Sequence, residues 1–343
     1  MNKIIDFKKI TQKKDIKKEL EKEKSIFIYS ETSLNKNNIS LDNSNLICYS
    51  TSRITKEKDK IDSMFKSLDE VKKIISFGGG TATDIGKYLS NKYNIPLIAI
   101  PSMLSTNAYA TNKVALIIDN KVKSIDATTP TTIYLDTNIL NNSTENNLYG
   151  LVDIFSIYTA LRDWNLAVEY NNESKSEEYN QAKKLLKKMV DYVSRNDIET
   201  IEKDVEFAYT MIGDSGLITN KYGSGKPESG SEHIFAKALE KEINIPHAVS
   251  VTNGMILMII AQSIVINNSI LDENDIKVIN SLKKLNMYAL NKKYHVTYEL
   301  VEKVFKKLVP REDRYSVVNL IYKDNTIKEE VLKKYKKIME ENI

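Results

Sequence analysis

Two histidines and an aspartate in the second half of the sequence have side chains that could bind one divalent metal. His233 and His247 each follow a helix-breaking residue and open an amphipathic helical pattern, so both rings could point into one cleft. A catalytic metal needs a third protein ligand. Asp153 is the leading candidate, because it is an acid in an apolar helical stretch where an unpaired carboxylate is costly. For each histidine taken alone, a structural role is the commoner outcome.

A glycine-rich turn in the first half could bind phosphate groups. Gly78, Gly79 and Gly80 follow an apolar run and precede a helix-compatible segment. Glycines let the backbone approach a ligand closely, and a helix N-terminus favours an anion. Thr81 and Asp84 have the spacing of a capping box, which would fix the start of that helix. The pattern predicts a nucleotide site, with a plain strand-to-helix turn as the alternative.

The elements around this turn alternate between strand and helix. Short apolar runs predict strands at 25–30, 45–50, 71–77, 95–100 and 133–136, a hairpin at 114–124, and a helix at 56–73. Such alternation predicts a parallel sheet covered on both faces. Ligands bind at the carboxyl ends of such strands, where the glycine turn and the 101–107 loop both emerge.

The strand patterns end near residue 145, and long amphipathic patterns follow. The sequence predicts an α/β nucleotide-binding domain at 1–145, with a parallel Rossmann-like sheet, and an all-helical metal- and substrate-binding domain at 146–343. Residues 1–24 interleave lysines with acids and are interpreted as a solvated helix face.

Composition limits the classes of function. A net charge of +4 over 343 residues does not favour nucleic-acid binding. Cys48 is the single cysteine, which excludes an intrachain disulfide, and it is expected to be buried. No apolar stretch is judged long enough to span a membrane, and the N-terminus lacks an apolar leader segment, so we expect a cytoplasmic protein. The sequence allows a homo-oligomer, and it predicts that His295 is exposed.

Several segments, in order, resemble the superfamily of iron-containing alcohol dehydrogenases, glycerol dehydrogenases and dehydroquinate synthases, and most closely its glycerol-1-phosphate dehydrogenases. Residues 78–87 are similar to the family's GGGS-x-x-D-x-x-K loop, and Ser229-Gly230-Ser231-Glu232-His233 is the most specific match. The other matching segments are 101–110, 150–153, 163–167, 215–217, 223–228 and 314–316.

The resemblance implies a dehydroquinate synthase-like fold and a dehydrogenase that converts dihydroxyacetone phosphate to sn-glycerol 1-phosphate. NAD(H) or NADP(H) would bind on the glycine turn and the 101–107 loop. One divalent metal, zinc in preference to iron or nickel, would be held by Asp153, His233 and His247. The implied cofactor-binding residues are Gly78, Gly79, Gly80, Thr81, Asp84, Ser102, Ser105 and Thr106.

Three positions depart from the family pattern. Asn107 stands at the catalytic, substrate-contacting position where the dehydrogenases carry an aspartate, and Ala248 replaces a glycine. Lys113 adds a cation that could hold a substrate phosphate, with a plain surface lysine as the alternative. Asn107 and Lys113 support a second hypothesis, a phosphate-eliminating cyclase of the dehydroquinate synthase type that uses bound NAD and a metal.

Overall fold

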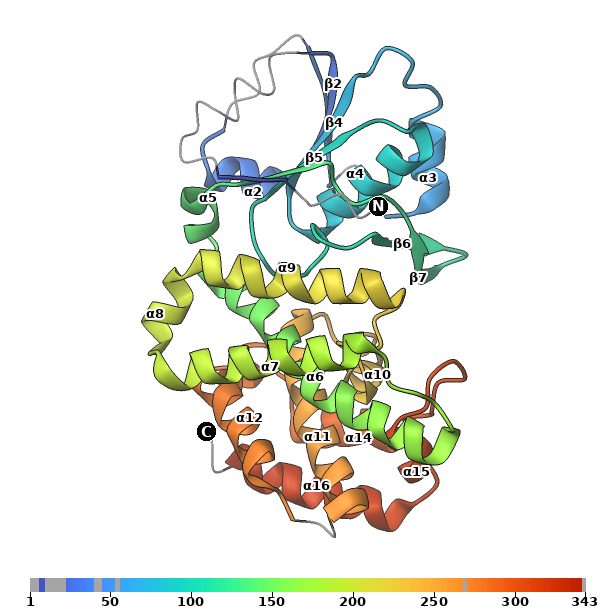
Figure 1. The fold of residues 1–343 in the computed structure, drawn as a ribbon, viewed down its shortest axis with the longest axis vertical. Coiled ribbons are helices and arrows are strands. Elements are labelled where there is room, and N and C mark those ends of the chain that lie inside the picture. Colours follow the sequence, from blue (N-terminus) through green and yellow to red (C-terminus); the bar gives the residue numbers. More distant parts are fainter. Residues whose placement is uncertain (1–5, 10–22, 40–44, 53–55, 268–269, 341–343) are drawn as a thin grey trace. The chain divides into compact units, whose positions relative to one another are not determined.

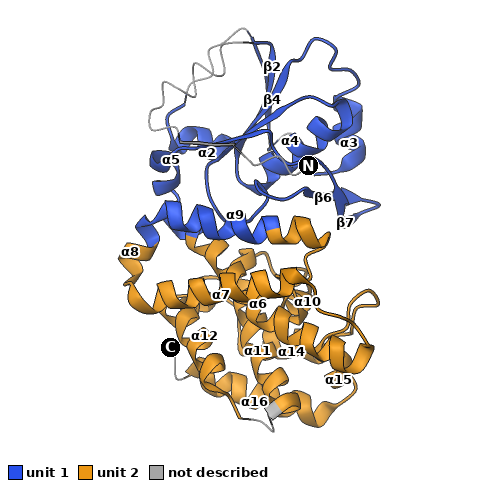
Figure 2. Ribbon diagram, in the orientation of Figure 1, with its two compact units in different colours: residues 1–147, 202–217 blue, residues 148–201, 218–343 orange. Residues whose placement is uncertain are grey.

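The computed structural model describes residues 6–9, 23–39, 45–52, 56–267 and 270–340. The chain forms two compact units, coloured separately in Figure 2. The first contains Met1–Asn147 and Glu202–Leu217, and the second contains Leu148–Ile201 and Ile218–Ile343. The first boundary between the units therefore lies at residue 147, two residues beyond the expected 145. The first unit also includes residues 202–217, which belong to the part of the chain that was expected to form a separate helical domain.

The first unit is built on a six-stranded, entirely parallel sheet (Figure 1). Its strands, in spatial order, are β1 (Asp6–Lys9), β8 (Thr132–Leu135), β5 (Leu97–Pro101), β4 (Lys73–Gly78), β2 (Ser25–Tyr29) and β3 (Leu46–Ser50). The strands predicted from apolar runs are confirmed. The helical interpretation of 1–24 is wrong at Asp6–Lys9, which pairs with β8, and its remaining residues up to 22 lie outside the described ranges.

Alternate residues of the strands pack on opposite faces of the sheet. Ile26 and Ile28 contact the core beneath α3 (Lys58–Met64) and α4 (Gly80–Tyr93). Phe27 lies between them and packs in the other core, with α2 (Glu31–Lys36) and α5 (Thr137–Asn141). This period of two explains why both faces are covered. The expected hairpin is confirmed as β6 (Lys113–Ile118) and β7 (Lys121–Asp126).

Two predictions about this unit are wrong. The helix expected at 56–73 ends at Met64. Phe65 and Val71 are nevertheless buried. The apolar spacing after Met64 therefore reflects the burial of an irregular segment and not a continuous helix. Cys48 is exposed instead of buried. Its strand, β3, lies at the edge of the sheet and has only one neighbouring strand.

Residues 202–217 join the first unit through small side chains and stacked rings. They include most of α9 (Val205–Tyr222). The Tyr109 hydroxyl donates to the Tyr209 carbonyl at 2.7 Å, and the two rings stack with centroids 5.0 Å apart. A Cβ on Gly216 would lie 2.9 Å from Ala110 Cβ, so glycine allows this close approach.

The described part of the second unit contains helices and no paired strands, apart from one isolated bridge between Arg311 and Arg314. Its helices include α6 (Thr144–Asn171, from Leu148 on), α7 (Glu177–Arg195), α10 (Ser231–Leu239), α11 (His247–Asn267), α12 (Glu273–Lys284), α14 (Tyr298–Lys306), α15 (Val317–Ile321) and α16 (Asn325–Glu340). The helical character expected from about residue 146 onward is confirmed for this unit.

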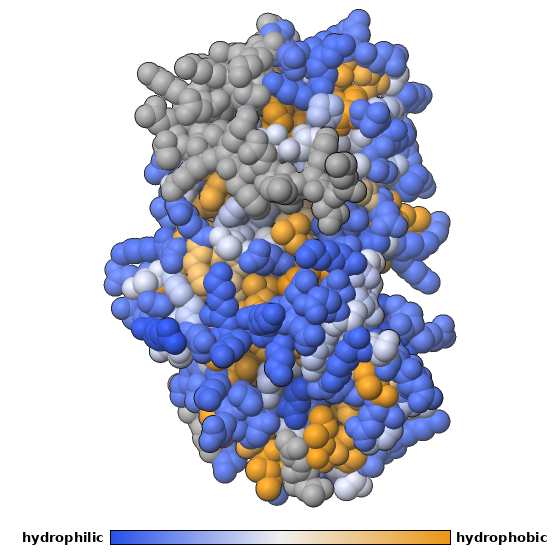
Figure 3. All heavy atoms as spheres, in the orientation of Figure 1, coloured by the Kyte–Doolittle hydropathy of each residue, from blue (hydrophilic) through white to orange (hydrophobic). Residues whose placement is uncertain are grey.

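Helix α11 is the apolar centre of the second unit. His247–Ile266 is long and apolar enough to cross a membrane by length and composition, so the expectation that no stretch reaches that length is wrong. In the fold, 83% of the tested window is buried, and every residue from Met255 to Ala261 is fully buried. Hydrophilic side chains instead cover most of the molecular face shown in Figure 3, with separate apolar patches among them.

Candidate metal and substrate site

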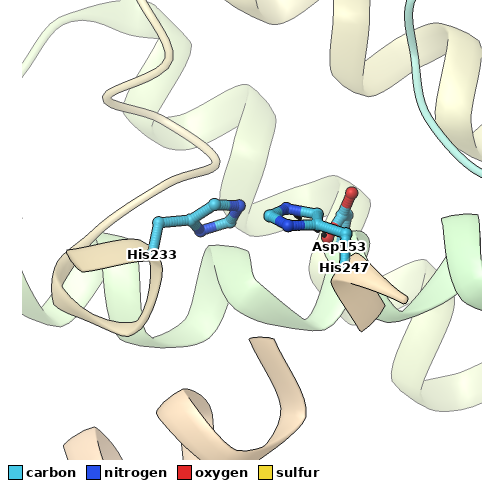
Figure 4. Close-up of side chains that lie close together, drawn as sticks. All are labelled: Asp153, His233 and His247. Atoms are coloured by element: carbon cyan, nitrogen blue, oxygen red, sulfur yellow. Dashed lines mark ion pairs between the residues drawn. The ribbon is translucent and has the colours of Figure 1, made fainter. Parts of the chain in front are cut away.

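The second unit brings the three candidate metal ligands together from three helices (Figure 4). Asp153 comes from α6, His233 from the first turn of α10, and His247 from the first residue of α11. Their ligand atoms all lie within 4.8 Å of one another. The imidazole centroids are 5.1 Å apart, and His247 Nε2 lies 3.9 Å from Asp153 Oδ1.

Asp153 has the character of a metal ligand. Its Oδ1 atom is buried and accepts no hydrogen bond from any described residue. Burial raises the pKa of Asp153, and the nearby His247 and His233 rings act against that rise. A buried carboxylate oxygen without a hydrogen-bond donor is expensive unless a cation faces it. One carboxylate and two imidazoles therefore fit a divalent metal by donor type, buried lone pair and mutual distance.

A buried glutamate holds the His233 ring. Glu232 Oε1 lies 2.7 Å from His233 Nδ1 and also accepts from the Gly230 N–H at 2.6 Å. Its Oε2 accepts from the Thr159 hydroxyl at 2.6 Å. These contacts fix the orientation of the ring and leave Nε2 as the nitrogen for a metal, which is the usual outer-shell arrangement of a metal-binding histidine.

A second glutamate holds the His247 ring in the same way. Glu240 Oε1 lies 2.7 Å from His247 Nδ1, and the Ser250 hydroxyl donates to the same oxygen. Burial acts to raise the pKa of Glu240, but the hydrogen bonds from His247 and Ser250 outweigh it and lower that pKa. The carboxylate is thus kept ionised beside the imidazole. No motif in the sequence marked Glu240, which caps the end of α10 and is separated from His247 by an irregular turn.

Asp163 anchors the loop that leads into His233. Its Oδ2 accepts from the Ser231 N–H at 2.6 Å, and its Oδ1 accepts at 2.9 Å from Gln262 Nε2 and from the Val317 N–H. Burial and the nearby Glu232 charge raise the pKa of Asp163 to about 6. One buried carboxyl thus ties α6, α11 and the start of α15 to the turn that positions His233.

Two glycines allow these elements to approach one another. A Cβ on Gly230 would lie 2.6 Å from Asp163 Oδ2 and 2.8 Å from Ala160 Cα. A Cβ on Gly254 would lie 2.5 Å from the Glu232 carbonyl oxygen, which is backbone and cannot rotate away. The position of Glu232, and with it the His233 ring, therefore depends on the absence of a side chain at these two places.

In the first unit, the glycine turn and the 101–107 loop lie together at the carboxyl ends of β4 and β5, as predicted. Gly78 has φ +152°, a conformation that favours glycine. A Cβ on Gly79 would lie 3.2 Å from Met103 Sδ, and one on Gly80 would lie 3.2 Å from Thr106 Oγ1. The absence of side chains at Gly79 and Gly80 therefore lets the turn pack closely against the 101–107 loop.

The capping box expected from Thr81 and Asp84 is wrong. Helix α4 begins at Gly80 with Gly79 as its N-cap, which has no side chain to cap with. The buried Asp84 carboxylate instead pairs with Lys56 at 2.8 Å and accepts from the Ala115 N–H at 3.3 Å. The first N–H groups of α4 are thus left without a side-chain cap.

The remaining candidate cofactor and substrate residues of the first unit lie in the 101–107 loop and in the hairpin. Ser102 is buried, and its hydroxyl lies 2.8 Å from the Ser33 hydroxyl. Ser105 is partly buried in the same loop, and the Asn107 carbonyl accepts from the Ala110 N–H at 2.9 Å. Lys113 pairs across the hairpin with Asp126. In the second unit, His295 is exposed, as predicted.

Comparisons with known proteins find similarity to one group of dehydrogenases. A family model described as "Iron-containing alcohol dehydrogenase" matches residues 29–143. A glycerol-1-phosphate dehydrogenase [NAD(P)+] of Methanococcus aeolicus is 36% identical over 177 residues, which are 50% of this chain and 51% of that protein. Its counterpart in Methanococcus vannielii is 32% identical over 231 residues, which are 65% of this chain and 67% of that protein.

These alignments span from about half to two thirds of the length of the curated relatives. Among solved structures, the chain is similar to a probable glycerol dehydrogenase from Sinorhizobium meliloti, with a TM-score of 0.67 at 11% identity. The alignment covers 98% of this chain and 97% of that one. This structural likeness extends over both units and concerns the fold.

Proposed function

We propose that this chain, which belongs to the glycerol-1-phosphate dehydrogenase family within the superfamily of iron-containing alcohol dehydrogenases, interconverts dihydroxyacetone phosphate and sn-glycerol 1-phosphate with NAD(H) or NADP(H). The observation that carries the proposal is the convergence of Asp153, His233 and His247 around the buried, unpartnered Asp153 Oδ1. We propose these three residues as the ligands of one divalent metal, with zinc preferred to iron or nickel.

A bound divalent metal would supply Lewis acidity toward the oxygen on the carbon that gains or loses hydride. The protein's part is to hold the ligands still. Glu232 and Glu240 each fix one imidazole through its Nδ1, so that the two Nε2 atoms stay directed at the site without reorganisation. Three protein ligands leave an open coordination position for substrate, which is typical of a catalytic rather than a structural site.

The nicotinamide cofactor would supply the hydride acceptor or donor. We assign its phosphates to the turn Gly78–Gly80 and the start of α4, because glycine backbone and uncapped helical N–H groups suit a pyrophosphate. We assign the rest of the proposed cofactor site to Thr81, Asp84, Ser102, Ser105 and Thr106. The proposed substrate contact is Asn107. Asp84 would act by holding the turn through Lys56 and Ala115.

The cyclase hypothesis gains no support from the described residues. It depended on Asn107 and on a free cation at Lys113, and Lys113 is paired with Asp126.

We also propose a cytoplasmic location, because the one cysteine, Cys48, is an exposed free thiol of the kind that persists in a reducing compartment. A homo-oligomer remains part of the hypothesis.

The test is absorbance at the NADH band with metal-loaded protein, dihydroxyacetone phosphate, and either NADH or NADPH. We expect loss of absorbance that a chelator abolishes and that His233→Ala lacks, and the comparison of the two cofactors gives the preference. A parallel assay follows phosphate release. Phosphate released without net oxidation of NADH would replace the dehydrogenase proposal with the cyclase.

A further inference from the structure

The second unit contains a hollow that is separate from the proposed metal site. Its volume is about 590 Å³, within the roughly 300–1,000 Å³ of most ligand pockets. Its lining comes from α6, α7, the end of α11 and α12, and includes none of the candidate metal ligands or the glutamates that hold them. We call it the amphipathic hollow, because part of its lining is apolar and part is charged.

The buried side of the amphipathic hollow is apolar. Leu161, Leu186 and Val278 are buried there, one from each of α6, α7 and α12. Ile266, near the end of α11, extends this apolar surface outward and is 45% exposed. Covering apolar surface in a concave site with an apolar group is favourable, because it removes that surface from water. This part of the hollow therefore suits a hydrocarbon group.

Two unpaired lysines also line the amphipathic hollow. Lys183 and Lys187 are exposed and lie one turn apart on α7, so they share one face of that helix. Among the residues that the structure describes, neither lysine forms an ion pair. The other two cations of the lining are already paired, Arg162 with Asp275 and Lys277 with Glu273.

The carboxylates of the lining offset this charge only in part. Asp272 caps α12 and accepts from the Asn274 and Asp275 N–H groups, at 2.8 and 2.9 Å. Asp191 follows Lys187 by one turn on α7, but in the described part of the chain the two form no ion pair. The lining contains four cationic side chains and two carboxylates, so it keeps a positive charge that attracts an anionic group.

We infer that the amphipathic hollow binds an amphiphilic anion, a small molecule with a hydrocarbon body and one anionic group such as a phosphate monoester. The hydrocarbon covers Ile266 and the buried apolar side chains, and the anionic group contacts Lys183 and Lys187. A wholly apolar ligand would take water from the two ammonium groups without replacing it, and a bare anion would leave the apolar surface wet. The inference is independent of the proposed reaction, because the hollow shares no residue with the metal site.

The test is calorimetric titration of the full-length, metal-loaded protein with octyl phosphate, kept below the concentration at which it forms micelles. Inorganic phosphate and octanol are titrated in parallel, because each carries only one half of the ligand. Wild type should bind octyl phosphate more than about tenfold more tightly than either half. Equal affinity for octyl phosphate and for one of the halves would contradict a site that uses both parts of its lining.

Variants then separate the two parts of the hollow. Lys183→Gln and Lys187→Gln should each weaken binding of octyl phosphate roughly tenfold, the loss of one charge-assisted contact, and leave binding of octanol unchanged. Ile266→Asn should weaken both ligands roughly tenfold, because it removes apolar contact area. Lys188→Gln is the control for the lysines, since Lys188 follows Lys187 but does not line the hollow. Ile276→Asn is the control for Ile266, because Ile276 is 47% exposed and also lies outside the lining.

Three other outcomes would overturn the inference. Binding of octyl phosphate that His233→Ala abolishes, and that the three hollow variants leave unchanged, would place the ligand at the metal site. Binding to vesicles of anionic phospholipid without binding of octyl phosphate would make the hollow a membrane contact. A dimer in sedimentation velocity that the hollow variants dissociate, again without binding of octyl phosphate, would make a second copy of the chain its occupant. Circular dichroism checks that each variant is folded.

Discussion

Glu240 Oε1 lies 2.7 Å from His247 Nδ1, and this contact determines which nitrogen of that ring faces Asp153. The remaining nitrogen, Nε2, is 3.9 Å from Asp153 Oδ1. A carboxylate in this position fixes the tautomer of a neutral imidazole and raises its basicity as a ligand. Glu240 is thus a positioning residue, separated from the metal by the histidine that it holds.

Glu240→Gln should lower metal affinity by about ten- to a hundredfold without unfolding the protein, because the amide removes the charge behind His247. Competition with a chromogenic chelator measures the affinity. Glu242→Gln is the control, since Glu242 lies two residues away and pairs with Lys303. Equal affinities in wild type and Glu240→Gln would contradict a positioning role for Glu240.

The order of thermal stability of wild type and Asp153→Asn should reverse when metal is added. Without metal, the variant should match or exceed wild type, because it removes a buried, unpartnered carboxylate oxygen. With metal at a hundred times its dissociation constant, wild type should gain about 2.7 kcal/mol and the variant almost nothing. Melting curves with and without zinc measure both. A metal-induced rise in Tm of equal size in both proteins would exclude Asp153 as a ligand.

Gly254→Ala should weaken metal binding although Gly254 is not a candidate ligand. A Cβ there would lie 2.5 Å from the Glu232 carbonyl oxygen, so α10 must shift and carry His233 with it. We expect a loss of a few kcal/mol in the free energy of unfolding, as for overpacked cores, together with lower metal affinity. Gly225→Ala is the matched control, because its Cβ would meet its nearest neighbour, Ser229 Cβ, at an ordinary 3.8 Å. The same behaviour in both variants would contradict the packing argument.

The stability of the first unit should depend on pH through Lys87. Its side chain is fully buried and donates to the Thr111 carbonyl at 3.0 Å and to the Lys113 carbonyl at 2.6 Å. Burial lowers the pKa of Lys87 to about 8, from an ordinary value of 10.5. Between these values the folded chain binds fewer protons at Lys87 than the unfolded chain, so this residue adds stability as pH rises.

Wild type should therefore gain about 2 kcal/mol in the free energy of unfolding relative to Lys87→Met between pH 7.5 and 9.5. Urea unfolding at the two pH values measures the difference. Lys121→Met, at an exposed position in the hairpin, should follow wild type. A free energy of unfolding of wild type that falls relative to that of Lys87→Met as pH rises would show that the sign is wrong.

The sequence predicted those parts of the fold and site that depend on local patterns. The apolar strands, the hairpin at Asp119–Asn120 and the helix starts at His233 and His247 each carry a short-range signal. Glu240 and Thr159 carried none, because their roles depend on how α6, α10 and α11 pack. Cys48 was assigned to the core because an apolar run does not reveal that its strand lies at a sheet edge. The capping box failed because Thr81 lies two residues beyond Gly79, the residue that caps α4.

The return of residues 202–217 to the first unit has a consequence for biosynthesis. Tyr109 and Ala110 obtain their partners, Tyr209 and Gly216, about a hundred residues later in the chain. While the protein is being made, the sheet can assemble early, but the first unit cannot be completed until residue 217 has left the ribosome. A nascent chain stalled before that point would present an unsatisfied tyrosine surface, and a fragment ending at 147 would keep it permanently.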